Sequence, residues 1–280
     1  YTHLGDAATQ TDNVVSPDDR WVFTEDNPGR ELAVAAGLAA SARVLVELDP
    51  ALAVECREVA ETLVARIPDL RPEHRLGPAL ELWLTTREAP YRQMLNECVF
   101  EASKSPERNG WLIARSLPYL TDETRPVAEA ALKNLARQLD QEAAKTPYGV
   151  PYEPAIWGAG WGIQRFGFRQ YWLYRAMPDL FPLSRMLDAL GFVLGCHPGS
   201  NTCSFVSGVG THSMDPGYGV NRADHASIPG GVGSGTALIR PDFPELLEWP
   251  YLWQQTEYCL GSATSDYVFL VAAADRLLNA

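Results

Sequence analysis

The sequence predicts an all-α protein built from stacked helical hairpins. Apolar residues recur three and four positions apart in long segments, which is the period of an amphipathic helix. No segment sustains the alternation of apolar and polar residues that a half-buried strand shows. Short turns marked by proline separate the helical segments. Because short connections place successive helices side by side, we expect antiparallel helix pairs.

Helical periodicity begins at Glu31 and recurs to the C-terminus. The expected helices cover approximately residues 31–49, 51–67, 79–87, 91–103, 123–145, 164–175, 182–194 and 265–279, with a short apolar segment at 111–117. Pro68, Pro72 and Pro78 are expected to break the chain before the third helix, since proline lacks the amide hydrogen that a helix interior requires. Thr121 or Asp122 is the expected N-cap of the longest helix.

Two segments lack a helical period. Residues 1–29 are irregular, with recurring Asp, Asn, Pro and Gly. Residues 195–250 are rich in Gly, Ser, Asn, Asp and Pro, and form a segment far longer than an ordinary connection between helices. Long loops in a compact domain are usually functional or disordered, and the aromatic residues in this loop favour function. We therefore expect a single domain over residues 1–280 with a long functional loop at 195–250.

Composition limits the classes of function. The chain has 280 residues, 46% of them hydrophobic, which is enough to bury a large core. The net charge of −12 disfavours nucleic acid or an anionic membrane surface as a partner, and it is compatible with a neutral polysaccharide. No apolar run reaches the roughly 18 residues that a membrane-spanning helix needs.

The cysteines and histidines predict neither a metal site nor a cofactor. No pair of the five cysteines has the CxxC spacing typical of zinc ligands, and the five histidines are dispersed. The chain begins without an initiator methionine and without a basic-then-apolar signal segment. We therefore expect it to be a piece of a longer protein, with an upstream segment.

Glu257 is the first candidate for catalysis. It is the single carboxylate in the stretch from Trp249 to Ser262, where the other side chains are mostly aromatic, amide or apolar. Apolar neighbours desolvate a carboxyl group and raise its pKa, which suits it to hold a proton near neutral pH and to act as a general acid. The alternative is an acid near a helix N-terminus whose charge interacts only with the helix dipole.

Four short motifs follow one another in the second half of the chain. They are Trp157-Gly-Ala-Gly-Trp-Gly, Leu194-Gly-Cys-His-Pro, Ser204-Phe-Val-Ser-Gly-Val-Gly210, and Thr256-Glu257 before the last helix. Their order resembles glycoside hydrolase family 9, whose counterparts are Trp-Gly-Trp-Gly, Leu-Gly-x-Asn-Pro, Ser-Tyr-Val-Thr-Gly-x-Gly and an Asn-Glu pair. The similarity covers nearly all of this chain and about the C-terminal two-thirds of the family's catalytic domain.

The resemblance implies a toroid of helical hairpins, of the (α/α)6-barrel type, that is incomplete in this chain. It implies a cellulase-like, inverting hydrolase of β-linked glycans, with the 195–250 loop at one end of a cleft. In inverting hydrolysis one carboxylic acid protonates the leaving oxygen, and a second carboxylate ~6.5–9.5 Å away activates water. Glu257 matches the family's general acid. The residues expected to contact sugar are aromatic or basic: Trp157, Trp161, Arg222, His225, Trp253 and Tyr258.

The sequence departs from the family where the catalytic base is expected. The family's base comes from an Asp-Ala-Gly-Asp-Tyr segment near its N-terminus, and this chain offers only Asp6 and Asp12 without that pattern. We expect the base in the upstream segment. After Gly210 the family's Pro-His-His-Arg is replaced by a stretch containing Arg222 and His225. The resemblance therefore does not predict cellulose itself as the substrate.

The helix start at Asn27-Pro-Gly-Arg-Glu resembles the family's Pro-Gly-Ser-Asp calcium-binding start, and it is also altered. Arg30 and Ala35 stand where oxygen ligands are expected, which leaves Glu31. Because a hard cation takes six or more oxygen ligands, we expect no calcium there.

Two functional hypotheses remain. The first is a glycoside hydrolase acting on a β-linked glucan or a related oligosaccharide, active only if an upstream segment supplies the base. The second is a non-catalytic, carbohydrate-binding helical scaffold that lacks the base. Family habit suggests a secreted or periplasmic protein in either case.

Overall fold

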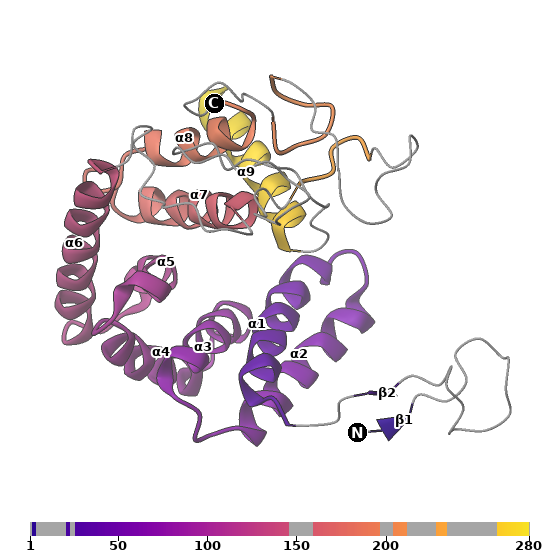
Figure 1. Cartoon of the computed structure of the whole chain (residues 1–280). Helices are drawn as coiled ribbons and strands as arrows, with labels where there is room; N and C mark the ends of the chain where they lie inside the picture. The colour runs from indigo at the N-terminus through magenta and orange to yellow at the C-terminus, as the bar shows by residue number, and fades with distance from the viewer. Residues whose placement is uncertain are drawn as a thin grey trace, which may run out of the picture. The chain divides into compact units, whose positions relative to one another are not determined.

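The computed structural model describes residues 2–3, 21–22, 26–145, 159–196, 204–211, 228–233 and 262–279. Helices dominate these residues and confirm the all-α class (Figure 1). The helices are α1 Pro28–Leu45, α2 Pro50–Arg66, α3 Pro72–Thr86, α4 Ala89–Ala102, α5 Pro106–Ser116, α6 Thr124–Ala143, α7 Ala159–Ala176, α8 Ser184–Val193 and α9 Ser262–Leu278. A 3-10 turn covers Leu117–Tyr119, and β1 (Thr2–His3) pairs antiparallel with β2 (Trp21–Val22).

The chain divides into two compact units, Tyr1–Cys98 and Val99–Ala280. The expectation of a single partial domain over the whole chain therefore stays a prediction. Within the part of the chain that the structure describes, no helix is both long enough and apolar enough to cross a membrane.

In the first unit, α1 packs against both α2 and α3. The core between them contains Leu32, Ala35 and Ala39 of α1, each 0% exposed. Both hairpin helices begin with a side-chain cap, because the Asn27 Oδ1 atom accepts from the Arg30 amide at 3.1 Å and the Asp49 Oδ1 atom accepts from the Leu52 amide at 3.0 Å. Small alanine side chains allow the close approach of the helices.

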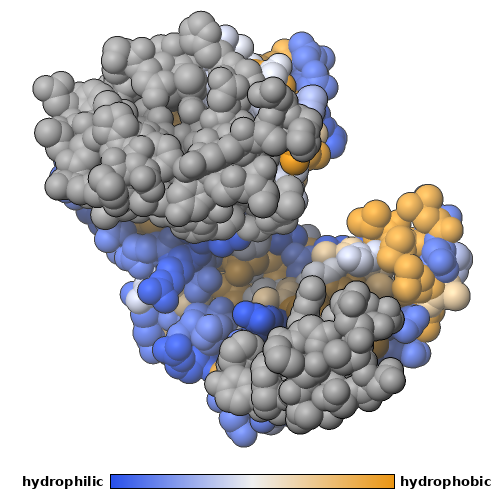
Figure 2. Space-filling view, turned by 45° about the vertical axis from the view of Figure 1, so that its right-hand side comes forward, coloured by the Kyte–Doolittle hydropathy of each residue, from blue (hydrophilic) through white to orange (hydrophobic). Residues whose placement is uncertain are grey.

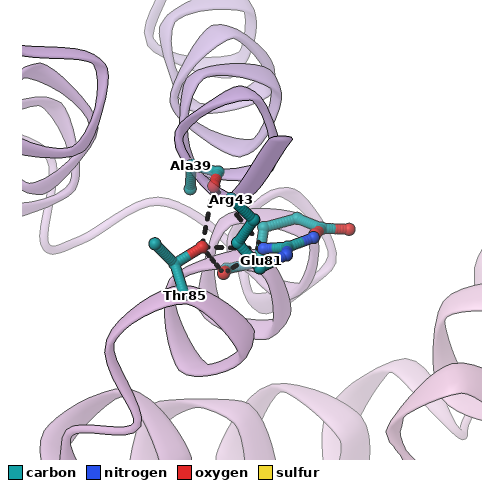
Figure 3. Close-up of polar contacts among 4 residues, drawn as sticks. All are labelled: Ala39, Arg43, Glu81 and Thr85. Atoms are coloured by element: carbon teal, nitrogen blue, oxygen red, sulfur yellow. Dashed lines mark hydrogen bonds and ion pairs between the residues drawn. The ribbon is translucent and has the colours of Figure 1, made fainter. Parts of the chain in front are cut away.

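Hydrogen bonds and an ion pair connect α1 to α3 (Figure 3). The Arg43 guanidinium forms an ion pair with the Glu81 carboxylate and donates to the Thr85 Oγ1 atom at 2.7 Å. It also donates to the Glu81 carbonyl oxygen at 2.9 Å, and the Thr85 hydroxyl donates to the Ala39 carbonyl oxygen at 2.7 Å. The buried Glu81 carboxylate is thus compensated by charge and by hydrogen bonds, as a buried ion requires.

The prediction that Pro72 and Pro78 break the chain before the third helix is wrong. Helix α3 begins at Pro72, in the first turn, where a missing amide hydrogen costs nothing. Pro78 lies inside the helix and is buried. The apolar core that contains Leu76, Ala79 and Leu80 outweighs the loss of one helical hydrogen bond.

The second unit holds α5 to α9. Helices α5 and α6 form one pair and α7 and α8 another, while α7 also packs against α5 and α9. The N-cap position of α6 is Glu123 and not the predicted Thr121 or Asp122, although the Thr121 Oγ1 atom accepts from the Thr124 amide at 3.3 Å. Three of these helices, α7, α8 and α9, directly follow or precede the sequence motifs described above.

Candidate functional site

Most of the predicted site residues lie outside the described part of the chain. These are Glu257, Trp157, Arg222, His225, Trp253 and Tyr258. Trp161 is described only by its backbone, in the first turn of α7. The site is therefore built from the helices and segments that precede or follow these residues.

Helices α7 and α8 run antiparallel. Near the start of α7, Ile163 shares a buried cluster with Val193 at the end of α8. Further along α7, a Cβ atom added at Gly167 would lie 3.1 Å from the Ala189 Cβ atom. The end of α8 therefore lies beside the beginning of α7, so the motif Leu194-Gly-Cys starts where the motif ending at Gly162 enters α7.

Helix α9 advances in the same direction as α7. The Arg165 Nε atom lies 3.8 Å from the Asp266 Oδ2 atom, and the Phe168 and Phe269 ring centroids lie 5.0 Å apart. A Cβ atom added at Gly167 would lie 3.0 Å from the Leu270 Cδ1 atom. The two helices therefore begin at the same end, and Glu257 precedes α9 by only a few residues.

The segment Ser204–Thr211 is bound to the end of α8. The Phe205 amide donates to the Val193 carbonyl oxygen at 2.8 Å, and the Thr211 amide donates to the Leu194 carbonyl oxygen at 3.1 Å. The Ser204 hydroxyl donates to the Val193 carbonyl oxygen at 3.3 Å and its oxygen accepts from the Val206 amide at 2.9 Å. Phe205 and Val206 are 0% exposed, so apolar burial and hydrogen bonds together fix this motif.

A second short segment, 228–233, supports the first. The Ser207 amide donates to the Gly231 carbonyl oxygen at 2.8 Å, and the Gly233 amide donates to the Phe205 carbonyl oxygen at 2.6 Å. Val206 and Val232 form an antiparallel bridge, and Val232 is 0% exposed. These described parts of the 195–250 loop have no helix, as expected, and they pack on the α7–α8 core.

The glycines of the Ser-Gly-Val-Gly motif have a steric role. Gly208 and Gly210 adopt φ angles of 73° and 90°, a backbone conformation that residues with a side chain rarely adopt. At Gly210 an added Cβ atom would lie 2.3 Å from the Leu194 carbonyl oxygen. The motif can therefore pass close to the end of α8 only with glycine at this position.

The described elements that adjoin the four motifs thus lie at one end of the α7–α8–α9 group. The first motif enters α7, the second leaves α8, the third is hydrogen-bonded to the end of α8, and the fourth precedes α9. The structure therefore brings together the starts of α7 and α9, the end of α8 and the segment Ser204–Thr211, which adjoin or carry these motifs.

A charged cluster that the sequence analysis did not identify lies at the same end. Arg165 and Arg169 of α7 are one turn apart, and both interact with Asp266 of α9. Burial raises the pKa of the Asp266 carboxyl, against the opposing effect of the two arginines. Burial lowers the pKa of the Arg169 guanidinium, Arg165 lowers it further, and Asp266 opposes both. Only the spacing of the two arginines could have signalled this cluster from the sequence.

An aromatic cluster joins α5, α7 and α9, and it too was not identified. Trp111 and Phe168 meet edge to face at 5.2 Å, and Phe269 contacts Phe168, Tyr171 and Trp172. The Arg115 guanidinium lies 4.6 Å from the Trp172 ring centroid and 5.6 Å from that of Trp111. Aromatic pairs and a cation–π contact of this kind stabilise the packing of the three helices.

The altered helix start at residue 27 is occupied by protein contacts. The Glu31 carboxylate forms an ion pair with Arg66 of α2. Among the residues that the structure describes, no group of three His, Cys, Asp or Glu side chains could hold a metal ion.

The fold defines a class: helical hairpins of the kind that build α/α toroids. No family model matches the sequence, and no curated protein is similar to it. Solved structures are similar, however, and several of them are named as glycoside hydrolases of family 9 or as cellulases. The chain is similar to AaCel9A in complex with cellobiose-like isofagomine, with a TM-score of 0.70 and 15% identity over 91% of this chain and 56% of that chain.

Two further structures agree. The cellulase Cel9M of C. cellulolyticum gives a TM-score of 0.69 and 16% identity over 94% of this chain and 68% of that chain. The Bacteroides ovatus GH9 structure gives a TM-score of 0.65 and 17% identity over 88% of this chain and 53% of that chain. The resemblance to the family is thus confirmed for the fold. The chain spans about half the length of several of these structures, for example 44% of endoglucanase J30.

Proposed function

We propose that the protein containing this chain is an inverting glycoside hydrolase that cleaves a β-linked glucan or a related oligosaccharide. The observation that supports this most is that the starts of α7 and α9, the end of α8 and the segment Ser204–Thr211, which adjoin or carry the four motifs, lie at one end of these helices. A saccharide substrate is supported by the similar structures, since one holds cellobiose-like isofagomine and another, Cel9M, holds cellobiose.

In this proposal Glu257 is the general acid. It precedes α9, whose first turns are held against α7 by Asp266 and Phe269. Aromatic and apolar neighbours in sequence favour the protonated carboxyl, which can donate to the leaving glycosidic oxygen. Trp157, Trp161, Trp253 and Tyr258 would stack on sugar rings, and Arg222 and His225 would donate hydrogen bonds to sugar hydroxyl groups.

The second carboxylate, which activates water, would come from an upstream segment of the same protein. This chain has no aspartate pair with the family's pattern, since Asp6 and Asp12 lie outside such a context. The same observation favours the alternative function, a non-catalytic carbohydrate-binding scaffold. The two functions differ in turnover and agree in binding.

The test compares the full-length protein with its Glu257→Gln variant on dyed β-glucan and on aryl glycosides. Glu248→Gln is the matched control, because Glu248 lies in the same part of the sequence and has no proposed role. We expect Glu257→Gln to lose about 10²–10⁴-fold in turnover, the usual contribution of general acid catalysis, and the control to lose little. Calorimetric binding of a β-linked oligosaccharide should survive in both variants.

Two results would reject parts of this proposal. Unchanged turnover in the Glu257→Gln protein removes this residue from the mechanism. Binding of oligosaccharide by a full-length protein that turns over neither substrate rejects the hydrolase and supports the scaffold.

A further inference from the structure

Helix α7 is basic although the chain as a whole is acidic. The chain has 35 acidic and 23 basic residues, and hydrophilic residues cover much of the coloured surface in Figure 2. Helix α7 nevertheless contains Arg165, Arg169 and Arg175 and no Asp or Glu. The first two of these arginines are one turn apart and lie toward the end where α7 and α9 begin.

The two arginines share one acidic partner in the part of the chain that the structure describes. The Arg165 Nε atom lies 3.8 Å from the Asp266 Oδ2 atom, which is an ion pair too long for a hydrogen bond. Arg169 interacts with the same carboxylate only at longer range, and it forms no ion pair or hydrogen bond with the described residues. Two positive charges therefore face one negative charge, which leaves one positive charge uncompensated.

This uncompensated charge is partly desolvated. The side chain of Asp266 is 16% exposed, and that of Arg169 is half-buried. Burial and the neighbouring Arg165 both lower the pKa of the Arg169 guanidinium, which means that the two like charges repel each other. A further anion beside them would reduce this repulsion, and the side chain of Arg165, 55% exposed, leaves the cluster accessible from solvent.

The chemistry of the three side chains matches a sugar acid. A guanidinium is a planar group of N–H donors that binds a carboxylate through two parallel hydrogen bonds. The Asp266 carboxylate accepts no hydrogen bond from the described residues, so its oxygens remain acceptors for hydroxyl groups. A uronic acid carries a carboxylate and neighbouring hydroxyl groups on one ring, so it can use both kinds of partner.

The carboxyl of Glu257 is the other candidate occupant, because it precedes α9 by only a few residues. Two adjacent guanidinium groups would favour its ionised form and lower its pKa. A general acid must instead hold its proton near neutral pH. The proposed role of Glu257 thus argues for a carboxylate that comes from the ligand.

We propose that Arg165, Arg169 and Asp266 form a subsite for the carboxylate of a uronic acid unit, and that the preferred substrate is an acidic β-linked oligosaccharide. This inference rests on the proposed function, which supplies the saccharide. The net charge of −12 acts against an anionic ligand at long range, so a preference for one must come from this local positive charge.

The test measures binding by calorimetry in the full-length protein, with ligands that differ only in charge. They are a neutral β-linked glucose trisaccharide and the three trisaccharides in which one glucose is oxidised at C6 to glucuronic acid. The preference is the dissociation constant of the neutral ligand divided by that of the acidic one. We expect the wild type to bind at least one acidic trisaccharide roughly tenfold more tightly than the neutral one, as a hydrogen bond to a charged group allows.

Two variants should change this preference in opposite directions. Arg169→Gln removes the uncompensated positive charge and should abolish the preference, whereas Asp266→Asn removes the competing carboxylate and should increase it. Arg175→Gln is the matched control, because it makes the same change of charge at an exposed position in the last turn of α7. It should keep the wild-type preference. A role in packing alone would weaken the binding of all ligands alike.

Three results would overturn the proposal. A wild type without a preference rejects the subsite and leaves the hydrolase proposal standing, since that proposal is tested by Glu257→Gln. A preference that neither Arg169→Gln nor Asp266→Asn changes would place recognition of the acidic sugar elsewhere. An unchanged preference in Arg169→Gln, with a shifted pH profile of turnover on the neutral substrate, would assign the arginines to Glu257. Conversely, a wild type that prefers the acidic ligand and turns over no glycan keeps the subsite and rejects the hydrolase.

Discussion

Replacement of Gly210 by alanine tests the attachment of the Ser204–Thr211 segment. The added Cβ atom would lie 2.3 Å from the Leu194 carbonyl oxygen and 2.9 Å from the Ser204 side chain. The carbonyl belongs to the backbone at the end of α8, so it cannot yield by a side-chain rotation. Its displacement would also break the hydrogen bond from the Thr211 amide at 3.1 Å.

The magnitude follows from three contributions. Positive φ costs about 1–2 kcal/mol for a residue with a side chain. Overpacking adds roughly 1–3 kcal/mol, and the lost hydrogen bond adds about 0.5–1.5 kcal/mol. Gly208 is the matched control, because its φ of 73° carries the first cost while nothing lies within 4 Å of an added Cβ atom. We therefore expect Gly210→Ala to destabilise the second unit by roughly 1.5–4.5 kcal/mol more than Gly208→Ala does.

Urea denaturation followed by tryptophan fluorescence and circular dichroism measures both variants against the wild type. Trp111 and Trp172 lie in the packed helices of the second unit and report its unfolding. Unfolding free energies of the two variants within about 0.5 kcal/mol of each other, less than the cost of one hydrogen bond, would refute the close approach to α8.

Further predictions concern stability. Gly37→Ala should raise the urea midpoint, since nothing lies within 4 Å of its added Cβ atom and alanine gains about 1 kcal/mol over glycine in a helix. Gly167→Ala should lower the midpoint, because its added Cβ atom would lie 3.1 Å from the Ala189 Cβ atom. A higher midpoint in both variants would contradict the packing of α7. Phe205→Ala should cost about 3–5 kcal/mol in the same assay, as loss of a fully buried ring does, and a cost below about 1 kcal/mol, a surface value, would contradict its burial. Burial raises the pKa of the Asp188 carboxyl, so the folded state binds its proton more tightly than the unfolded chain. The unfolding free energy should therefore fall as pH rises from the ordinary aspartate pKa of ~3.9 through the raised pKa of the folded state. Asp188→Asn should lack this fall and be the more stable protein above that window; parallel pH profiles of variant and wild type would exclude the effect.

The helices could be predicted from the sequence because their apolar period is long and regular. Their ends were less predictable, as Pro78 demonstrates: a local rule placed a break there, and core packing outweighed it. The ion pair of Arg43 and Glu81 was beyond prediction, since it depends on how α1 and α3 pack.

The candidate site was predictable as motifs and not as geometry. The Ser-Gly-Val-Gly motif was recognised in the sequence. The reason why glycine is needed at position 210, its close approach to the Leu194 carbonyl oxygen, could be seen only in the fold. Arg165 and Asp266 lie far apart in the sequence, so only the parallel advance of α7 and α9 brings them together. The role of Glu257 stays a prediction.

A crystal structure of the full-length protein with a bound β-linked oligosaccharide tests the central proposal most directly. We predict sugar density at the end of the protein where α7 and α9 begin and α8 ends, with the Glu257 carboxyl at a glycosidic oxygen. Sugar density at another surface, with Glu257 in bulk solvent, would contradict the proposed site.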